Sequence, residues 1–246
     1  MRFSIITITF NSEKFLEYTL QSIAEQDFTD YEHLIWDGGS TDKTLEIARS
    51  FPHVKIYEGK DKGISDAMNK GGMLAQGEFL LHLHSDDLLA HPTVLSKVDT
   101  FFRQHPQSSW GYGQAEIINS KGKLTRTTEF IPFCSKRLRK YNIITHPATF
   151  VSKELFARSG GFRTDLRYCM DYDLWLRLSK IAPALAIPSV LSKFREHTGS
   201  LSTSESQGVA DEAYKVRNKY VKNLWERYKS YRTWQKRRKK ALSESS

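Results

Sequence analysis

Residues 80–89 read Leu80-Leu81-His82-Leu83-His84-Ser85-Asp86-Asp87-Leu88-Leu89, and this stretch decides how the rest of the chain is interpreted. Its apolar residues are typical of a short buried strand, which runs into two adjacent carboxylates. Open α/β sheets bind ligands beyond the carboxyl ends of their strands. Because neighbouring carboxylates repel each other, we expect a hard divalent cation there, shared with a phosphate-bearing ligand.

Strand-like and helix-like segments alternate around this stretch. The residue pattern predicts buried strands at 3–10, 33–36 and 54–57, each followed by a helix. This order is typical of βαβ units, so we expect an α/β fold with a mostly parallel central sheet flanked by helices. After residue 108 the pattern changes to a predicted hairpin, two more strands and a helix that begins at Met170 with acidic residues in its first turn.

The composition is that of an ordinary globular protein. The 246 residues are 39% hydrophobic and 26% charged, and no apolar run is long enough to span a membrane. Met1-Arg2 leads directly into the first strand, so we expect no signal peptide. Cys134 and Cys169 form no CxxC pair, which favours a reducing, cytoplasmic location.

The net charge of +9 lies in the tail of the chain. Residues 211–240 hold 12 of the 37 basic residues and 3 of the 28 acidic ones, which leaves the remainder neutral. From Val209 onward, apolar and aromatic residues recur every three or four positions, which predicts a long amphipathic helix with a basic face. This helix can pack on the body, lie on an anionic membrane over residues 209–240, or bind nucleic acid. We expect no nucleic-acid partner.

Short motifs in a fixed order make the sequence similar to the family 2 glycosyltransferases with the GT-A fold, of the bacterial surface-polysaccharide type. The resemblance covers roughly residues 3–202. The residues that carry it are Thr9-Phe10-Asn11, Asp37-Gly38-Gly39-Ser40-Thr41-Asp42, Asp61 to Gly71, Ser85-Asp86-Asp87, Gly160-Gly161-Phe162, Asp171 to Arg177, and Arg195-Glu196-His197. It implies inverting transfer of a sugar from a nucleotide donor, usually a UDP-sugar, with a divalent metal such as Mn²⁺ or Mg²⁺.

The resemblance also implies roles for individual residues of the donor site. Asp37 would contact the nucleobase with Thr9 beside it, and Asp61 and Lys62 would line the nucleotide pocket. Asp86 would lie near the ribose. In the metal site, Asp87 would ligate the metal at the diphosphate and His197 would reach back to the same metal.

Asp171 would be the general base, with Asp173 as a rival two residues later. The family often has Glu where Met170 stands, Asn where His84 stands and Gln where Pro147 stands. The chain also lacks the QxxRW motif of processive members, so we expect one sugar to be added per binding event. A zinc site of His82, His84 and Asp86 is an alternative, although core histidines are the commoner explanation of such a pattern.

These observations predict a GT-A domain at residues 1–202 and a basic amphipathic helical extension at 203–246. The expected activity is transfer of one sugar to a hydroxyl of a glycan or a lipid-linked acceptor in surface-polysaccharide synthesis. Lipid-linked acceptors favour a peripheral position on the inner face of the cell membrane. The alternative is a catalytically inactive GT-A protein that binds nucleotides or an anionic surface. Loss of turnover with retained nucleotide binding in Asp171→Asn would separate the two.

Overall fold

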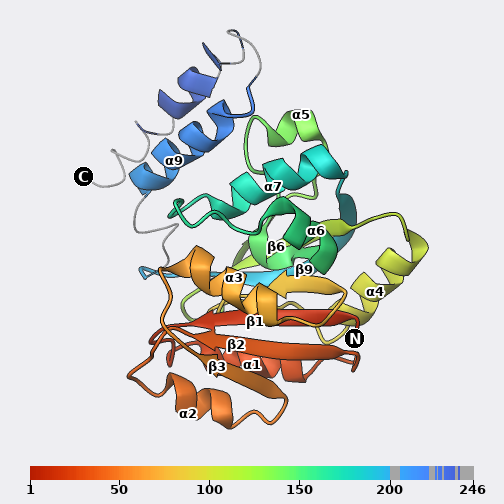
Figure 1. The fold of residues 1–246 in the computed structure, drawn as a ribbon, viewed down its shortest axis with the longest axis vertical. Helices are drawn as coiled ribbons and strands as arrows, with labels where there is room; N and C mark the ends of the chain where they lie inside the picture. The colour runs from red at the N-terminus through yellow and green to blue at the C-terminus, as the bar shows by residue number, and fades with distance from the viewer. Residues whose placement is uncertain (200–205, 222–224, 226, 229, 236–237, 239–246) are drawn as a thin grey trace.

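The computed structural model describes residues 1–199, 206–221, 225, 227, 228, 230–235 and 238. A mixed sheet with the strand order β3-β2-β1-β4-β8-β6-β9-β5, and with β7 paired to β6, runs through its centre (Figure 1). The strands are β1 (Phe3–Thr9), β2 (Tyr31–Asp37), β3 (Val54–Glu58), β4 (Phe79–His82), β5 (Leu88–Leu89), β6 (Trp110–Asn119), β7 (Leu124–Thr127), β8 (Thr149–Ser152) and β9 (Leu185–Glu196). The helices are α1 (Leu16–Ala24), α2 (Thr44–Arg49), α3 (Ile64–Leu74), α4 (Val94–Gln104), α5 (Ser135–Leu138), the 3₁₀ turn η1 (His146–Ala148), α6 (Lys153–Ser159), α7 (Met170–Ile181) and α9 (Ser206–Asn218).

The first half of the sheet is parallel, as the βαβ pattern predicts. β1 lies between β2 and β4 and pairs with both in parallel, and β2 pairs with β3 in the same way. The second half is mixed: β8 is antiparallel to β4 and β6, while β6 and β9 run parallel. The α/β prediction is confirmed, and every antiparallel pair contains at least one strand from after residue 108, where the sequence pattern changes.

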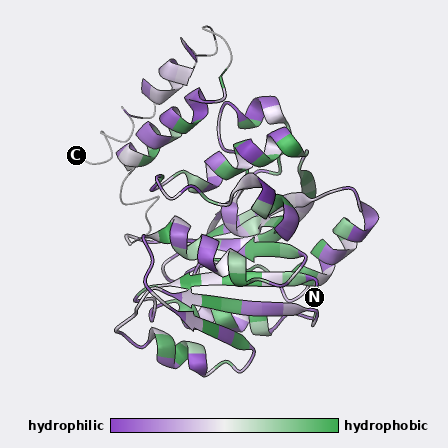
Figure 2. Ribbon diagram, in the orientation of Figure 1, coloured by the Kyte–Doolittle hydropathy of each residue, from purple (hydrophilic) through white to green (hydrophobic). Residues whose placement is uncertain are grey.

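Alternating side chains bury both faces of the sheet. Ile6 and Leu80 pack into one core with α3, α6 and α7, whereas Ile5 and Leu81 pack into a second core with α4. Successive residues of a strand point to opposite faces, so the near-continuous apolar strands require helices on both sides. Figure 2 shows this as green strands whose covering helices are green on part of their surface and purple on the remainder.

The C-terminal helix α9 packs on the body and belongs to the same core. Ala213 and Val216 are buried in the cluster that also contains Leu174 and Leu178 of α7. In Figure 1 α9 lies alongside α7 at the end of the molecule away from β3. The apolar face predicted for the extension is therefore covered by protein along α9. The predicted boundary between residues 202 and 203 lies outside the described residues.

The stretch that opened the sequence analysis is less regular than predicted. β4 ends at His82, and the amide of Leu83 adds one more ladder bond to Ile6 O at 3.0 Å. Asp87 N then donates to His84 O at 3.1 Å and closes a turn, after which β5 pairs with β9. The carboxylates therefore lie in a turn between two short strands. Among the described residues, none of the helices has the length and apolar character needed to cross a bilayer.

Candidate active site

Three parallel strands end at one edge of the sheet, and each end carries a predicted site residue. Thr9 ends β1 opposite Asp37 at the end of β2, and the turn containing Asp86 follows β4. Carboxyl ends of neighbouring parallel strands form the usual ligand-binding edge of such a sheet. The structure thus brings the predicted nucleotide and metal residues to a common edge.

Asp37 is fully buried and its carboxylate is bonded within the protein. Oδ2 accepts from Thr9 Oγ1 at 2.7 Å and from Ser40 Oγ at 2.6 Å, and Oδ1 accepts from the amides of Gly39 and Ser40 at 2.9 and 2.7 Å. Burial opposes ionisation, but the bonds from Ser40, Thr9 and Gly39 outweigh it and hold the pKa of Asp37 below its ordinary value. Asp37 and Thr9 therefore fix the shape of the turn after β2.

Asp61 lies close over that turn. Its Oδ2 accepts from Trp36 Nε1 at 3.3 Å, and a Cβ placed on Gly38 would lie 2.8 Å from the same oxygen. The side chain of Lys62 is exposed, while its amide donates to Asp66 Oδ2 at 2.9 Å. Asp61 is thus beside the strand edge, and Lys62 is on the rim of the same loop.

Asp86 and His197 meet although they are far apart in the sequence. His197 Nε2 lies 3.0 Å from Asp86 Oδ2, and both side chains are partly exposed. The imidazole of His197 also packs on the ring of Phe15, with the ring centroids 5.0 Å apart. Residue 197 follows β9, which runs beside β5, and this pairing brings the histidine to the turn.

Asp87 lies deeper than its neighbour. Its relative exposure is 1%, its Oδ1 accepts from the backbone amide of Arg195 at 3.0 Å, and its carbonyl accepts from Thr19 Oγ1 at 2.7 Å. Burial and the nearby charge of Asp86 raise the pKa of Asp87 well above its ordinary value. One carboxylate oxygen of Asp87 thus links β9 to the turn after β4 through a hydrogen bond.

The donor atoms at this turn suit a divalent cation. His84, Asp86 and Asp87 each offer a ligand atom, and these atoms lie within 4.8 Å of one another. Carboxylate oxygens with an imidazole nitrogen suit Mn²⁺ well, and Mg²⁺ accepts the oxygens. His82 is separate from this group: it is buried against Met68 O, and burial lowers its pKa to about 3. His82 is thus a core histidine.

Asp171 lies in the first turn of α7. Its Oδ1 accepts from Tyr172 N at 2.6 Å and its Oδ2 accepts from Asn142 Nδ2 at 3.2 Å. Burial raises the pKa of Asp171 to about 6, although these hydrogen bonds act in the opposite direction. A carboxylate with such a pKa is ionised at neutral pH and still basic enough to accept a proton.

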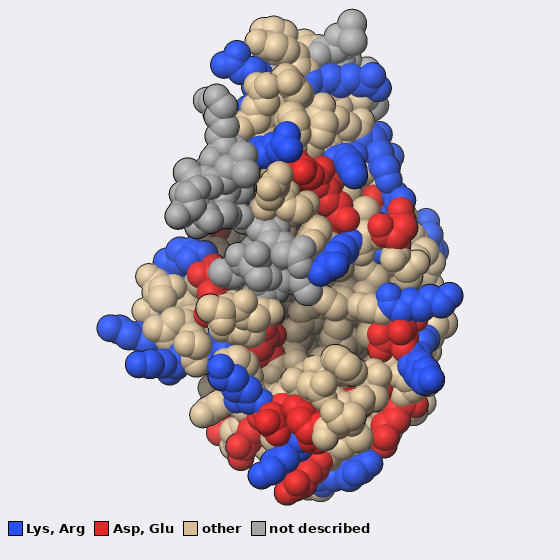
Figure 3. All heavy atoms as spheres, turned by 90° about the vertical axis from the view of Figure 1, so that its left-hand side faces the viewer, with Lys and Arg blue, Asp and Glu red and all other residues tan. Residues whose placement is uncertain are grey.

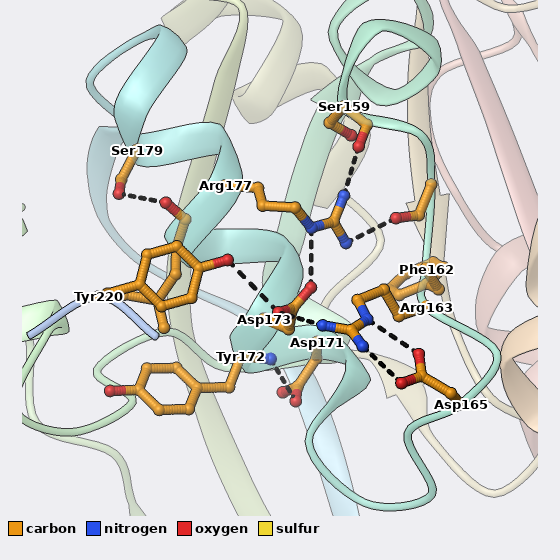
Figure 4. A network of polar contacts seen from close by, with 12 residues as sticks. Ser159, Phe162, Arg163, Asp165, Asp171, Tyr172, Asp173, Arg177, Ser179 and Tyr220 are labelled. Atoms are coloured by element: carbon orange, nitrogen blue, oxygen red, sulfur yellow. Dashed lines mark hydrogen bonds and ion pairs between the residues drawn. The ribbon is translucent and has the colours of Figure 1, made fainter. Parts of the chain in front are cut away.

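Asp173, the rival base, is held in an ion-pair network (Figure 4). Its exposure is 1%; Oδ2 lies 2.7 Å from Arg177 Nε, and Oδ1 lies 3.8 Å from Arg163 Nη1. Tyr220 donates its hydroxyl to the same Oδ1 at 3.3 Å, and Arg177 continues to the carbonyl of Gly161 at 2.7 Å. A carboxylate with this many internal partners stabilises the packing of α7 and is poorly placed to accept a substrate proton.

Histidine 146 connects the two parts of the site. Its ring centroid lies 4.9 Å from that of His84 in the turn after β4 and 6.0 Å from that of Trp175, one turn after Asp171 on α7. His146 Nε2 and Trp175 Nε1 are both buried without a protein hydrogen-bond partner. The helix of the predicted base, α7, and the predicted donor edge are thus joined through packed rings.

A cavity of about 220 Å³ is lined by the residue that donates a hydrogen bond to the predicted base. It is lined by residues 112–114, 128–131 and 142–145, and includes Asn142, the hydrogen-bond partner of Asp171. The sequence analysis did not single out Tyr112, Gln114, Glu129 or Asn142. They come from β6 and from loops with no recognisable motif, so no sequence signal groups them.

Comparison with known proteins agrees with this architecture. The sequence model described as glycosyl transferase family 2 matches residues 4–157. The chain belongs to glycosyl transferase family 2. It is 36% identical over 183 residues to a PGL/p-HBAD biosynthesis glycosyltransferase of Mycobacterium bovis, which covers 71% of this chain and 68% of the relative. It is 27% identical over 225 residues to the chondroitin synthase of Escherichia coli, covering 90% of this chain and 33% of that protein.

Solved structures confirm the GT-A fold of this glycosyltransferase. S. aureus TarS residues 1–349 in complex with UDP-GlcNAc superposes with a TM-score of 0.74 at 22% identity, covering 93% of this chain and 69% of TarS. The mannosyltransferase PcManGT of Pyrobaculum calidifontis, in complex with GDP-Man and Mn²⁺, has a TM-score of 0.67 at 18% identity, covering 90% of this chain and 64% of PcManGT. The family membership makes this chain a nucleotide-sugar-dependent glycosyltransferase.

Proposed function

We propose that this glycosyltransferase moves one sugar, with inversion and with the help of a divalent metal, from a UDP-sugar to a hydroxyl of a glycan or lipid-linked acceptor. The observation that supports this most strongly is the carboxyl group of Asp171, whose pKa of about 6 suits a general base and whose hydrogen-bond partner Asn142 lines a cavity of about 220 Å³. The packed rings of His84, His146 and Trp175 lie between α7, which carries Asp171, and the residues at the donor edge.

The residues of the chain divide the chemistry between them. The turn after β2, held by Asp37, lets Gly38 and Asp61 form a close-fitting wall for the nucleoside. Asp171 accepts the proton of the acceptor hydroxyl as that oxygen attacks the sugar carbon. A single base acting on the face opposite the leaving diphosphate gives inversion of the anomeric centre.

For the metal we favour Asp86 and His197 as the ligands that face the donor, with His84 and Asp87 within reach. Asp86 and His197 are the more exposed and already in contact, whereas Asp87 is buried and engaged by the amide of Arg195. Bound there, a divalent cation would stabilise the negative charge of the departing nucleoside diphosphate. This assignment differs from the sequence-based expectation, which gave the metal to Asp87 and the ribose to Asp86.

A donor screen tests the proposed function. The full chain is incubated with Mn²⁺ and, in turn, UDP-glucose, UDP-galactose, UDP-N-acetylglucosamine and GDP-mannose, and the released nucleoside diphosphate is measured with and without simple glycoside acceptors. We expect turnover with a UDP-sugar, loss of turnover in Asp171→Asn, and no loss in the matched control Glu154→Gln, whose carboxylate is 81% exposed on α6. Nucleotide binding without turnover would support the inactive alternative, and NMR of the product reports its anomeric configuration.

We further propose that the C-terminal extension holds the enzyme on an anionic inner leaflet, which gives access to lipid-linked acceptors. Trp225, Tyr228 and Tyr231 have relative exposures of 64%, 49% and 40%, and aromatic rings of this kind favour the headgroup region. Figure 3 shows several Lys and Arg side chains over the upper part of the molecule, with a few acidic ones among them, and both kinds of charge in its lower part. Salt-sensitive sedimentation with phosphatidylglycerol vesicles, weakened in Trp225→Ser but not in the exposed control Met73→Ser, would support this role.

A further inference from the structure

The N-terminal end of the base helix is bound by a carboxylate from the C-terminal extension. Glu212 of α9 accepts three backbone hydrogen bonds there: from Arg167 N to Oε1 at 2.9 Å, and from Tyr168 N and Cys169 N to Oε2 at 2.6 and 2.7 Å. These amides lie immediately before α7, which begins at Met170. The amides at a helix start have no partner within the helix, so a carboxylate at this place satisfies donors and matches the helix dipole.

Helix α9 is itself firmly placed, so this contact has a defined position. Ala213 and Val216, one and four residues after Glu212, are buried in the core with α7. Cys169 Sγ lies 3.7 Å from Val209 O, which adds a second contact to the same segment. The bound segment ends two residues before Asp171, and the orientation of this first turn determines where the base carboxylate points.

Glu212 also affects the base through its charge. Besides burial, which is the main cause, the negative charge of Glu212 raises the pKa of Asp171. The other groups around the base differ in kind: Asn142 from the preceding loop is neutral, and Asp173 on α7 is paired with Arg177. The carboxylate from α9 is therefore the charge by which the extension influences proton transfer.

We propose that Glu212 is a positioning residue for Asp171, by which the C-terminal extension sets the orientation of the base and the pH at which it works. This inference depends on the proposed role of Asp171 as general base. The extension lies beyond residues 4–157, the part of the chain that matches the family model. Removal of the extension would therefore impair catalysis even with the donor pocket intact.

The experiment compares four variants of the full chain in the nucleotide-release assay. Glu212→Gln removes the charge but keeps one acceptor oxygen, while Glu212→Asp keeps the charge with a shorter reach. Glu154→Gln, on the surface of α6, is the matched control, and Asp171→Asn tests the base. For each variant kcat and donor KM are measured from pH 4.5 to 8.5, together with the melting temperature.

The inference makes separate predictions for charge and reach. In Glu212→Gln, kcat falls about 10- to 100-fold because the base is misplaced, while donor KM stays at the wild-type value. The acidic limb of the kcat profile moves to lower pH, because loss of the negative charge lowers the pKa of Asp171. In Glu212→Asp the limb stays at the wild-type pH and kcat falls less. The control behaves as wild type.

The outcomes distinguish this inference from the proposed function. Activity in Asp171→Asn would refute the base assignment itself, whatever Glu212 does. An inactive Asp171→Asn together with wild-type kcat in Glu212→Gln would overturn the inference alone. So would a Glu212→Gln enzyme with lower kcat but an acidic limb at the wild-type pH, because that is the behaviour of a structural contact whose charge has no effect on the base. The melting temperatures show which variants remain folded across the pH range.

Discussion

Replacing the base should make the protein more stable as well as inactive. In the Asp171→Asn variant the side chain keeps its size and can still accept from Tyr172 N, the bond that measures 2.6 Å in the wild type. The bond from Asn142 Nδ2 to Oδ2 is lost, because an amide nitrogen can then stand where that oxygen was. The change therefore removes one hydrogen bond and the charge of a side chain that is only half-buried.

The pKa of Asp171 gives the size and the sign of the effect on stability. Its rise from 3.8 to about 6 corresponds to at most about 3 kcal/mol of unfavourable free energy for the ionised form in the folded state. This cost is absent below pH 3.8, grows as the pH rises toward 6, and is complete above it. The lost Asn142 hydrogen bond offsets about 1 kcal/mol. Because Asp171 is only half-buried, solvent screening makes the cost of its charge smaller than about 3 kcal/mol. The variant should therefore be more stable than the wild type by about 1–2 kcal/mol at pH 8.

The assay is thermal unfolding of both proteins at several pH values, alongside nucleotide release. At pH 8 the variant should melt about 2–8 °C higher than the wild type. The two opposing effects cancel near about pH 4.5, where the melting temperatures should coincide. Turnover in the variant should fall by about 10²- to 10⁴-fold at every pH, the usual contribution of a general base.

Two results would refute this reasoning. A difference in melting temperature that is the same at pH 4.5 and pH 8 would mean that Asp171 has no raised pKa in the folded protein. A wild-type kcat that does not fall about tenfold between pH 7 and pH 5 would mean that an ionised group with a pKa of about 6 is not needed for turnover.

Three further predictions follow from the geometry of the site and of the sheet. Removing the metal with EDTA should abolish nucleotide release, and Mn²⁺ should restore it. Asp86→Asn should raise the Mn²⁺ concentration for half-maximal activity about tenfold or more. An Asp86→Asn enzyme with wild-type metal dependence would contradict the assignment of Asp86 as a metal ligand. Gly38→Ala places a Cβ 2.8 Å from Asp61 Oδ2, so donor KM should rise about tenfold with little change in melting temperature. Gly77→Ala places a Cβ 2.5 Å from the backbone of Phe3 and Ser4, so chemical denaturation should show a loss of about 1–3 kcal/mol while donor KM stays unchanged.

The donor half of the fold is readable from the sequence because its determinants are local. Each parallel strand is a short apolar run that ends in polar residues such as Thr9 or Asp37, and parallel strands bring these ends to one edge. The amphipathic pattern of the extension is local too, and it predicts a helix there, although α9 ends at Asn218 and a turn at residues 219–220 interrupts the long helix that the pattern predicts. The sequence does not predict which surface the apolar face of α9 packs against, because its burial against α7 depends on residues about 40 positions earlier in the chain.

The choice between Asp86 and Asp87 as the metal ligand depends on contacts that are distant in the sequence. Adjacent residues in a turn point in different directions, and no pattern says which one faces the ligand. Here the amide of Arg195, 108 residues later, engages Asp87, and His197 meets Asp86. The role of Glu212 cannot be predicted from the sequence for the same reason. It is one acidic residue on a predicted helix, and its three hydrogen bonds depend on how α9 packs.

The buried histidines explain how the donor edge and the base helix can be held together without charge pairing. Burial lowers the pKa of His82 to about 3 and that of His146 well below its ordinary value, so both rings are neutral in the pH range where Asp171 is ionised. Neutral rings pack on each other and on Phe162 and Trp175 without repulsion. A lysine or arginine at position 146 would place an unpaired charge in this layer. It would also push α7 away from the turn after β4, and the separation of these two elements must match the length of a sugar and its acceptor hydroxyl. If Asp171 is the base, as proposed, this apolar layer holds α7 and the donor edge in one arrangement over the pH range in which Asp171 is ionised.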